Sequence, residues 1–90
     1  MLNAVRTTQF KRDLKLAEKR SKKMSKLKDV MTKLILEESL EEKHRDHKLS
    51  DNYMNHRECH IEPDWLLIYR LIGKEVHFVR TGTHSDIFDR

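Results

Sequence analysis

The feature that most constrains this chain is a short apolar run near its C-terminal end, Trp65-Leu66-Leu67-Ile68-Tyr69-Arg70-Leu71. Turn-forming residues bound the run, with Pro63-Asp64 before it and Gly73-Lys74 after it. A bounded run of this length, rich in aromatic and branched side chains, predicts a β-strand. Successive side chains of a strand point to opposite faces, so a run that is apolar at nearly every position indicates a central strand covered on both faces.

The segments on either side of this run predict an antiparallel meander. Residues 57–62 alternate in polarity, and apolar Cys59 and Ile61 share one face. The polar residues take the other face: Glu58, His60 and Glu62. Residues 76–81 form the next expected strand, and the tail of residues 82–88 is expected to leave the sheet. Short turns between these strands favour antiparallel neighbours.

The N-terminal half predicts a short strand and two helices. Residues 2–5 are the expected strand, and Thr7-Thr8 offers a hydroxyl that can cap a helix ending near Arg20. A second helix is expected over residues 24–38, and the short link predicts an antiparallel helix hairpin. Residues 39–56 have little periodicity, so we expect a long loop there, and loops of this length are usually functional.

These elements predict one α+β domain over residues 1–90, in which a short N-terminal strand and an antiparallel helix hairpin pack on one face of an antiparallel β-sheet. No apolar run approaches the roughly 20 residues of a membrane span, and the first six residues do not begin a signal peptide. We therefore expect no membrane partner. A single cysteine, Cys59, excludes an internal disulfide and suits a reducing cytoplasm.

Charge is divided unevenly along the chain. Residues 1–33 hold eleven Lys and Arg against three Asp and Glu, a balance of +8, whereas residues 34–90 have a balance of −4. A basic half indicates contact with a polyanion such as RNA or DNA. The alternative is a solvated helix face rich in lysine.

Three blocks of this sequence resemble the signature of the YafQ-type mRNA interferase toxins of the RelE/ParE superfamily. They are Asp46-His47-Lys48-Leu49, then Arg57-Glu58-Cys59-His60-Ile61-Glu62-Pro63-Asp64-Trp65, then Arg80-Thr81-Gly82-Thr83-His84-Ser85-Asp86-Ile87-Phe88. The resemblance implies a RelE-like fold and a bacterial cytoplasmic endoribonuclease that cleaves mRNA on the ribosome without a metal or cofactor. It also implies a cognate DinJ-like antitoxin, which would carry the toxin to operator DNA.

The resemblance also implies which residues perform the chemistry. Cleavage by a ribose 2′-OH requires a general base, a general acid and cations on the phosphoryl oxygens. The matching positions are His47, His60, Asp64 and His84. We expect His84 to be the acid, and His60 and His47 to provide the base and bind phosphate. Asp64 either orients an imidazole or acts as the base.

Other matching positions are candidates for binding RNA. Arg57 and Arg80 are expected to bind phosphate, because a guanidinium donates two parallel N–H bonds. Phe88 can stack on a nucleobase or simply pin the tail to the core, and Trp65 either flanks the substrate or packs in the core. Basic residues near the helix link are expected to dock on RNA: Lys19, Arg20, Lys22, Lys23 and Lys26. The remaining histidines are expected to be structural or exposed: His44, His56 and His77.

The sequence departs from the family's pattern in residues 50–56, where two glycines, a tryptophan and a lysine of the family are absent. Asp51 and Asn55 tolerate a left-handed backbone, so the turns can persist. Losing the lysine removes one possible phosphate contact.

Three other functions are open to a chain of this kind. A ParE-like toxin would inhibit DNA gyrase, but such proteins are not expected to carry this histidine set. A non-catalytic protein would act only as an antitoxin-bound transcriptional corepressor. A zinc site is not expected, because Cys59 and His60 are adjacent in a strand and point to opposite faces, and no Cys/His pair has ligand spacing.

Overall fold

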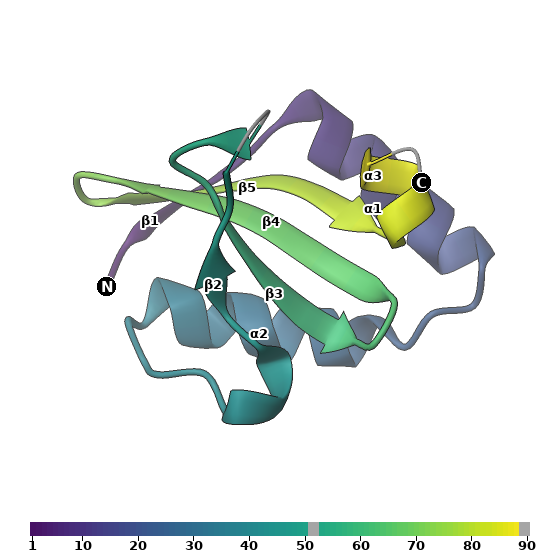
Figure 1. Ribbon diagram of the computed structural model, residues 1–90, viewed down its shortest axis with the longest axis horizontal. Coiled ribbons are helices and arrows are strands. Elements are labelled where there is room, and N and C mark those ends of the chain that lie inside the picture. The colour runs from purple at the N-terminus through teal and green to yellow at the C-terminus, as the bar shows by residue number, and fades with distance from the viewer. Residues whose placement is uncertain (51–52, 89–90) are drawn as a thin grey trace.

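The computed structural model describes residues 1–50 and 53–88, and it places one sheet between helices (Figure 1). The elements in chain order are β1 (Asn3–Arg6), α1 (Thr8–Lys19), α2 (Met24–Ile35), η1 (Glu42–His44), β2 (His47–Lys48), β3 (Arg57–Glu62), β4 (Trp65–Ile72), β5 (Glu75–Gly82) and α3 (His84–Phe88). None of the helices in these ranges is long and apolar enough to cross a bilayer. The α+β class predicted from the sequence is confirmed.

The sheet has the strand order β1-β5-β4-β3-β2, so the apolar run of β4 is central as predicted. The strands from β2 to β5 pair antiparallel, whereas β1 pairs parallel with β5. The sheet is therefore mixed and not purely antiparallel. Backbone hydrogen bonds fix β1 at both ends, from Asn3 N to Lys74 O (2.8 Å) and from Thr7 N to Phe78 O (3.1 Å).

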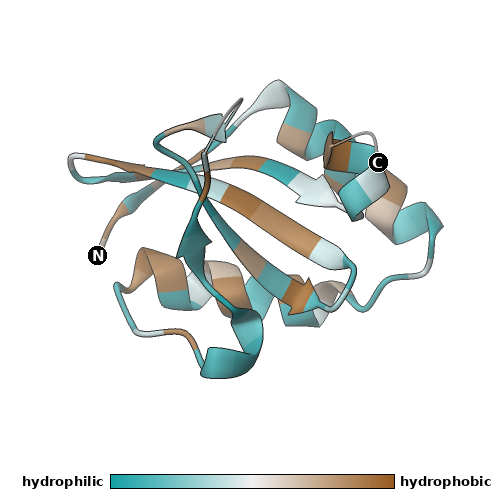
Figure 2. Cartoon of the chain, in the orientation of Figure 1, coloured by the Kyte–Doolittle hydropathy of each residue, from teal (hydrophilic) through white to brown (hydrophobic). Residues whose placement is uncertain are grey.

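Both faces of the sheet are covered, as the composition of β4 requires. On one face α1 and α2 pack against alternate residues of β3, β4 and β5, with α1 lying along β5 and α2 near β3. The fully buried side chains there include Phe10, Cys59, Tyr69 and Phe78. On the other face Leu66 and Ile68 are covered by Ile87 of α3 and by the segment around Leu49 and Tyr53. In Figure 2 the hydrophobic residues follow β4 along its length.

Caps and left-handed residues set where the elements end. Thr7 caps α1 as predicted, because its Oγ1 accepts from Phe10 N at 3.0 Å. The second helix ends at Ile35, earlier than predicted, and Glu37 beyond it has a left-handed φ of 60°. Residues 39–56 are not a plain loop, because they contain η1 and β2. Asn55, which was expected to tolerate a left-handed backbone, adopts one (φ 67°), while Asp51 lies outside the described residues.

Candidate active site

Three histidines from β2, β3 and α3 meet on the face of the sheet that α3 partly covers. The ring centroids of His47 and His60 are 6.4 Å apart, and those of His60 and His84 are 5.8 Å apart. His60 alternates with buried Cys59 along β3, so its ring lies opposite the α1/α2 core. The structure therefore brings together three candidates that are far apart in the sequence.

A buried carboxylate, Glu58, joins two of these histidines. It is 5% exposed, and its Oε1 lies 3.1 Å from His60 Nε2 and 3.7 Å from His47 Nε2. The sequence analysis did not select Glu58 as a site residue. The signal was present, because the alternation of β3 places Glu58 and His60 on the same face.

His84 is held by Asp64 from the β3–β4 turn. Asp64 Oδ1 accepts from the backbone N of His84 at 2.9 Å and lies 2.5 Å from His84 Nδ1. These two hydrogen bonds lower the pKa of Asp64 below its usual range, so the carboxylate is ionised at neutral pH. An imidazole that donates from Nδ1 to this carboxylate leaves its Nε2 free for proton transfer.

His47 is also held at Nδ1, in this case by a backbone carbonyl. Its Nδ1 lies 2.6 Å from Arg45 O, so a neutral ring donates there and presents Nε2 toward the site. The side chains of His47 and His84 are 51% and 44% exposed, whereas that of His60 is only 14% exposed. His60 is also engaged at both ring nitrogens, because Nδ1 lies 3.3 Å from Pro63 O and Nε2 lies near Glu58. The two outer histidines are therefore the accessible ones.

The Thr81-Gly82-Thr83-His84 stretch places α3 by local hydrogen bonding. Thr83 Oγ1 accepts from Asp86 N at 3.0 Å, and Asp86 Oδ2 accepts from Thr83 N at 2.9 Å, which together form a capping box. A Cβ at Gly82 would lie 2.9 Å from Asp86 Oδ2, so this position has no room for a larger residue. Its φ of 156° also lies in the region that favours glycine.

Trp65 packs in the core and does not flank the substrate site, which is one of the two alternatives that the sequence left open. Its side chain is 1% exposed, and its Nε1 donates to Thr81 Oγ1 at 3.0 Å. Thr81 Oγ1 in turn donates to Leu66 O at 2.7 Å. These bonds join the start of β4 to the end of β5 beneath the site, and they leave the ring no surface for RNA.

The two arginines proposed to bind phosphate occupy different faces. Arg80 pairs with Ile68, whose side chain belongs to the cluster under α3, so Arg80 lies on the histidine face. Arg57 instead shares its face with Cys59 and donates to Asp46 (3.2 and 3.1 Å) and to Tyr69 Oη (3.3 Å). The structure thus separates Arg57 from the histidines, and the phosphate role expected of it is not supported at this site.

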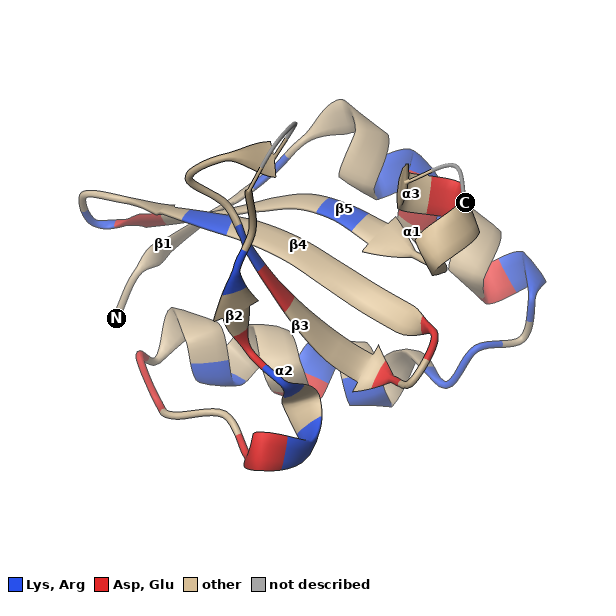
Figure 3. Ribbon diagram, viewed as in Figure 1, with Lys and Arg blue, Asp and Glu red and all other residues tan. Residues whose placement is uncertain are grey.

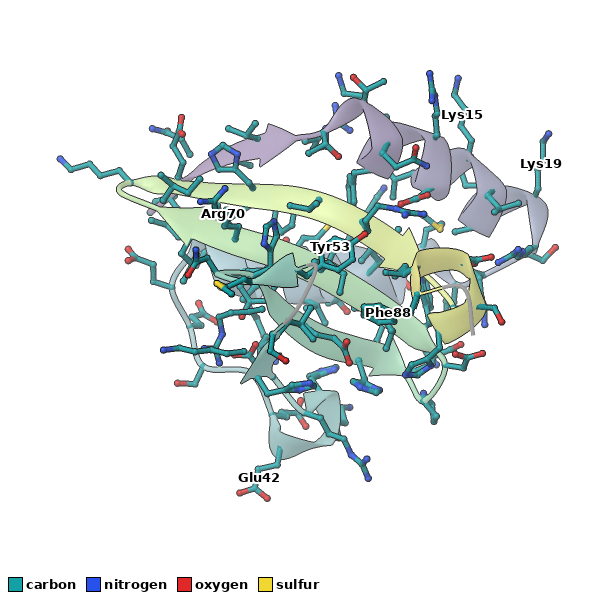
Figure 4. All side chains as sticks on the ribbon, turned by 45° about the horizontal axis from the view of Figure 1, so that its top comes forward. Lys15, Lys19, Glu42, Tyr53, Arg70 and Phe88 are labelled. Carbon is teal, nitrogen blue, oxygen red and sulfur yellow. The ribbon has the colours of Figure 1, made fainter. Side chains whose placement is uncertain are left out.

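Aromatic side chains adjoin the cluster. The Phe88 ring lies 6.5 Å from His84 and 5.8 Å from Tyr53, and Phe88 also packs on the core under α3. Figure 4 shows Tyr53 and Phe88 side by side on this face. Phe88 therefore anchors the tail and also places a half-buried ring next to His84.

The other histidines each contact a nearby carbonyl or carboxylate. Buried His44 contacts the carbonyl of His60 (Nδ1 to O, 2.7 Å), which supports β3 beneath the site. His56 lies 3.0 Å from Met54 O, and His77 lies 2.9 Å from Glu75 Oε1.

The basic residues expected to dock on RNA divide into two groups. Three of them hold carboxylates: Arg20 pairs with Asp86 (2.6 Å), and Lys22 and Lys26 each pair with Glu62 (2.9 Å). A register shift between His60 and Glu62 turns Glu62 toward these lysines, which lower its pKa. These ion pairs offset part of the positive charge of the three residues, and their expected role in docking on RNA stays a prediction. Lys19 and Lys23 are exposed and form no ion pair within residues 1–50 and 53–88.

Exposed cations continue along α1. Figure 4 shows Lys15 and Lys19 pointing away from the sheet, and Figure 3 shows further Lys and Arg on α1 and on the link to α2. This face of α1 is a basic surface distinct from the histidine cluster.

Three of the site's side chains could also hold a metal ion. Ligand atoms of Glu58, His60 and His84 all lie within 4.8 Å of one another. Cys59 faces the opposite core, as the alternation predicted, and burial raises its thiol pKa far above the usual range. Spacing rules could not find this cluster, because its third member comes from α3 and not from the same strand.

Comparisons with known proteins find a matching family and similar sequences. Residues 2–89 match the profile of the family described as the bacterial toxin of type II toxin–antitoxin system, YafQ. The mRNA interferase toxin YafQ of Escherichia coli (strain B / BL21-DE3) is 48% identical over 81 residues, 89% of this chain and 88% of the relative.

Solved structures give the same result. The crystal structure of the E. coli DinJ–YafQ complex contains a chain with a TM-score of 0.91 and 44% identity, covering 98% of this chain and 99% of that one. A metal-bound toxin from Helicobacter pylori has a TM-score of 0.92 and 34% identity, covering 98% of this chain and 100% of the other.

Proposed function

The chain belongs to the YafQ family of bacterial type II toxins, and from this premise we propose that it is an endoribonuclease that cleaves mRNA and thereby inhibits translation. The observation that carries the proposal is the convergence of His47, His60 and His84 with two carboxylates on one face of the sheet. An RNA-cleaving site needs both a proton acceptor and a proton donor near the phosphate, and this cluster offers both.

The proposed reaction is attack of a ribose 2′-OH on the adjacent phosphorus. The O2′–P bond forms as the P–O5′ bond breaks, a base takes the 2′ proton, and an acid protonates the leaving 5′ oxygen. The products are a 2′,3′-cyclic phosphate and a free 5′-OH. Each proton transfer typically contributes about 10²–10⁴ in rate.

The geometry favours His84 as the acid and His47 as the base. Both rings are exposed, and both are fixed at Nδ1, His84 by Asp64 and His47 by Arg45 O, which leaves Nε2 of each ring for proton transfer. Asp64 serves as the orienting group in this scheme. His60 lies between the two outer rings and can stabilise charge that develops on the phosphoryl oxygens if its Nε2 exchanges Glu58 for the phosphate.

Arg80 and Phe88 complete the proposed substrate site. Arg80 is the guanidinium on the histidine face, and although Asp13 occupies its Nε and Nη2, its positive charge there can attract a phosphate. Phe88 offers a ring on which a base next to the scissile phosphate can stack, and stacking tolerates any sequence.

The proposed partners follow from the family and from the charge. The E. coli relative forms a complex with DinJ, and we propose a DinJ-like antitoxin that covers the histidine face or the helices and takes the toxin to operator DNA. The basic surface of α1 and of the link to α2, which includes Lys15, Lys19 and Lys23, suits ribosomal RNA. The proposed place of action is the bacterial cytoplasm.

A second proposal concerns metal ions. We propose that a divalent transition metal bound by Glu58, His60 and His84 would inhibit cleavage, because it would occupy the proposed acid and its neighbour. The cleavage step itself would need no metal, since side chains provide each proton transfer. The metal-bound relative from H. pylori supports testing this.

Purified protein incubated with an mRNA, with and without ribosomes and in the presence of EDTA, tests the main proposal. Cleavage that leaves cyclic or 3′-phosphate ends supports it, and products with 3′-hydroxyl ends contradict the mechanism. Inhibition of gyrase without RNA cleavage would favour the ParE-like alternative. Operator binding with the antitoxin but without cleavage would favour the corepressor.

A further inference from the structure

We infer that Asp13 is a positioning residue for the cleavage reaction, acting through Arg80, and this inference rests on the proposed function. Asp13 lies on α1 and is 6% exposed. Its Oδ2 accepts from Arg80 Nε at 2.8 Å and from the backbone N of Thr81 at 3.0 Å. Its Oδ1 accepts from Arg80 Nη2 at 3.3 Å and from Gln9 Nε2 at 3.1 Å.

Packing of α1 on the sheet does not by itself call for a carboxylate at this position. The neighbouring buried residues of α1, Phe10 and Ala17, are apolar, and burying a charge costs free energy that a well-packed apolar side chain would avoid. The burial of Asp13 is matched by four accepted hydrogen bonds, two of which come from Arg80. The carboxylate therefore determines the direction of that guanidinium.

The Arg80 guanidinium is held by several hydrogen-bond partners. Nε and Nη2 are occupied by Asp13, and Nη2 also lies 3.4 Å from Asp86 O. A side-chain hydrogen bond with Tyr53, which packs beside Phe88 on the histidine face, also raises the pKa of Arg80 after the larger effect of Asp13, so a phosphate would reach the guanidinium by replacing the Tyr53 hydroxyl. A guanidinium fixed from below by a carboxylate is pre-organised to meet a phosphate, and pre-organisation lowers the barrier to reaction.

The test is single-turnover cleavage at saturating RNA by four proteins: wild type, Asp13→Asn, Arg80→Ala and the double variant. Asp13→Asn should lower the rate about 10–100-fold, while RNA binding is unchanged or tighter because a negative charge is removed. The double variant should be no slower than Arg80→Ala, because Asp13 has nothing left to position. Glu18→Gln, an exposed substitution on the same helix, is the matched control and should cleave normally.

A purely structural role for Asp13 predicts a different result. The rate decreases caused by the two single substitutions would then multiply in the double variant, and this outcome overturns the inference. So does normal cleavage by Asp13→Asn. If Asp13→Asn fails to fold, Asp13→Glu replaces it, and NMR compares the exchange of the Arg80 Nε–H proton with water in this variant and in the wild type. Faster exchange together with slowed cleavage supports the inference. Unchanged exchange together with slowed cleavage overturns it. Wild-type protein that cuts no RNA refutes the proposed function itself, and the inference falls with it.

Discussion

The ion pair between Arg20 and Asp86 gives a stability prediction whose size follows from the structure. Asp86 Oδ2 accepts from Arg20 Nη1 at 2.6 Å and from Thr83 N at 2.9 Å, and Oδ1 accepts from Arg20 Nη2 at 3.2 Å. The Arg20 guanidinium is the main cause that lowers the pKa of Asp86 from 3.8 to about 2. By linkage this drop corresponds to about 2.4 kcal/mol, at about 1.36 kcal/mol for each tenfold change.

Solvent reduces that figure. The Arg20 side chain is 42% exposed, and exposed pairs are screened by water and salt, so we expect Asp86→Asn to cost about 1 kcal/mol near neutral pH. For a domain of this size, that is a decrease in Tm of about 4–8 °C. The folded pKa lies below the unfolded one, so the stabilisation is fully present above about pH 4 and is lost as the pH falls toward about 2.

Urea unfolding of wild type and Asp86→Asn across this pH range measures the effect. The two stabilities should differ near neutral pH and converge at about pH 2, and Asp29→Asn, an exposed change on α2, should match wild type throughout. Equal stability of wild type and Asp86→Asn near neutral pH would refute the assignment. A difference that persists unchanged at about pH 2 would mean that the capping bonds to Thr83, and not the ion pair, are responsible.

Three further predictions concern the site. Gly82→Ala should lower both Tm and cleavage, because the new Cβ would lie 2.9 Å from Asp86 Oδ2, and normal activity of this variant would contradict the placement of α3. The double variant Lys19→Ala/Lys23→Ala should weaken binding to RNA or ribosomes and flatten the salt dependence of binding without changing Tm. The double variant Lys22→Ala/Lys26→Ala should also lower Tm, because it removes both ion pairs of Glu62. Filter binding measures the first effect and calorimetry the second. Zinc should inhibit cleavage by the wild type, and EDTA should restore the activity. Zinc should inhibit cleavage by Glu58→Gln less strongly, because this variant loses one of the metal ligands. Equal inhibition of both proteins would place the metal elsewhere.

Local patterns were sufficient to predict much of this fold. The apolar run of β4, the alternation of β3 and the cap at Thr7 each depend on neighbouring residues, so the sequence determines them directly. The parallel pairing of β1 depends on contacts with β5, more than 70 residues away, and a four-residue strand carries no signal for its direction. The two-residue strand β2 pairs with nearby β3 and was missed because so short a strand has no alternation of polarity to detect.

The site was predicted in part. The motif match selected the histidines that converge, and their separate segments would not have shown this by spacing alone. Ion pairs account for most of the differences between the site expected from the sequence and the site in the structure. Whether Arg20, Lys22 or Lys26 is a free cation depends on a carboxylate from another element, and composition does not reveal that partner. The face of Arg57 could have been inferred, because it shares the alternation of Cys59.

The central claim is that a histidine cluster cleaves RNA by acid–base chemistry. Its most direct test is the single-turnover rate of His84→Ala and His47→Ala at saturating RNA in EDTA, with His77→Ala as the matched control, since His77 lies in a Glu75 pair outside the cluster. Each site variant should be slower by about 10²–10⁴-fold with nearly unchanged Tm, while the control stays close to wild type. Site variants that cleave as fast as His77→Ala would contradict the account.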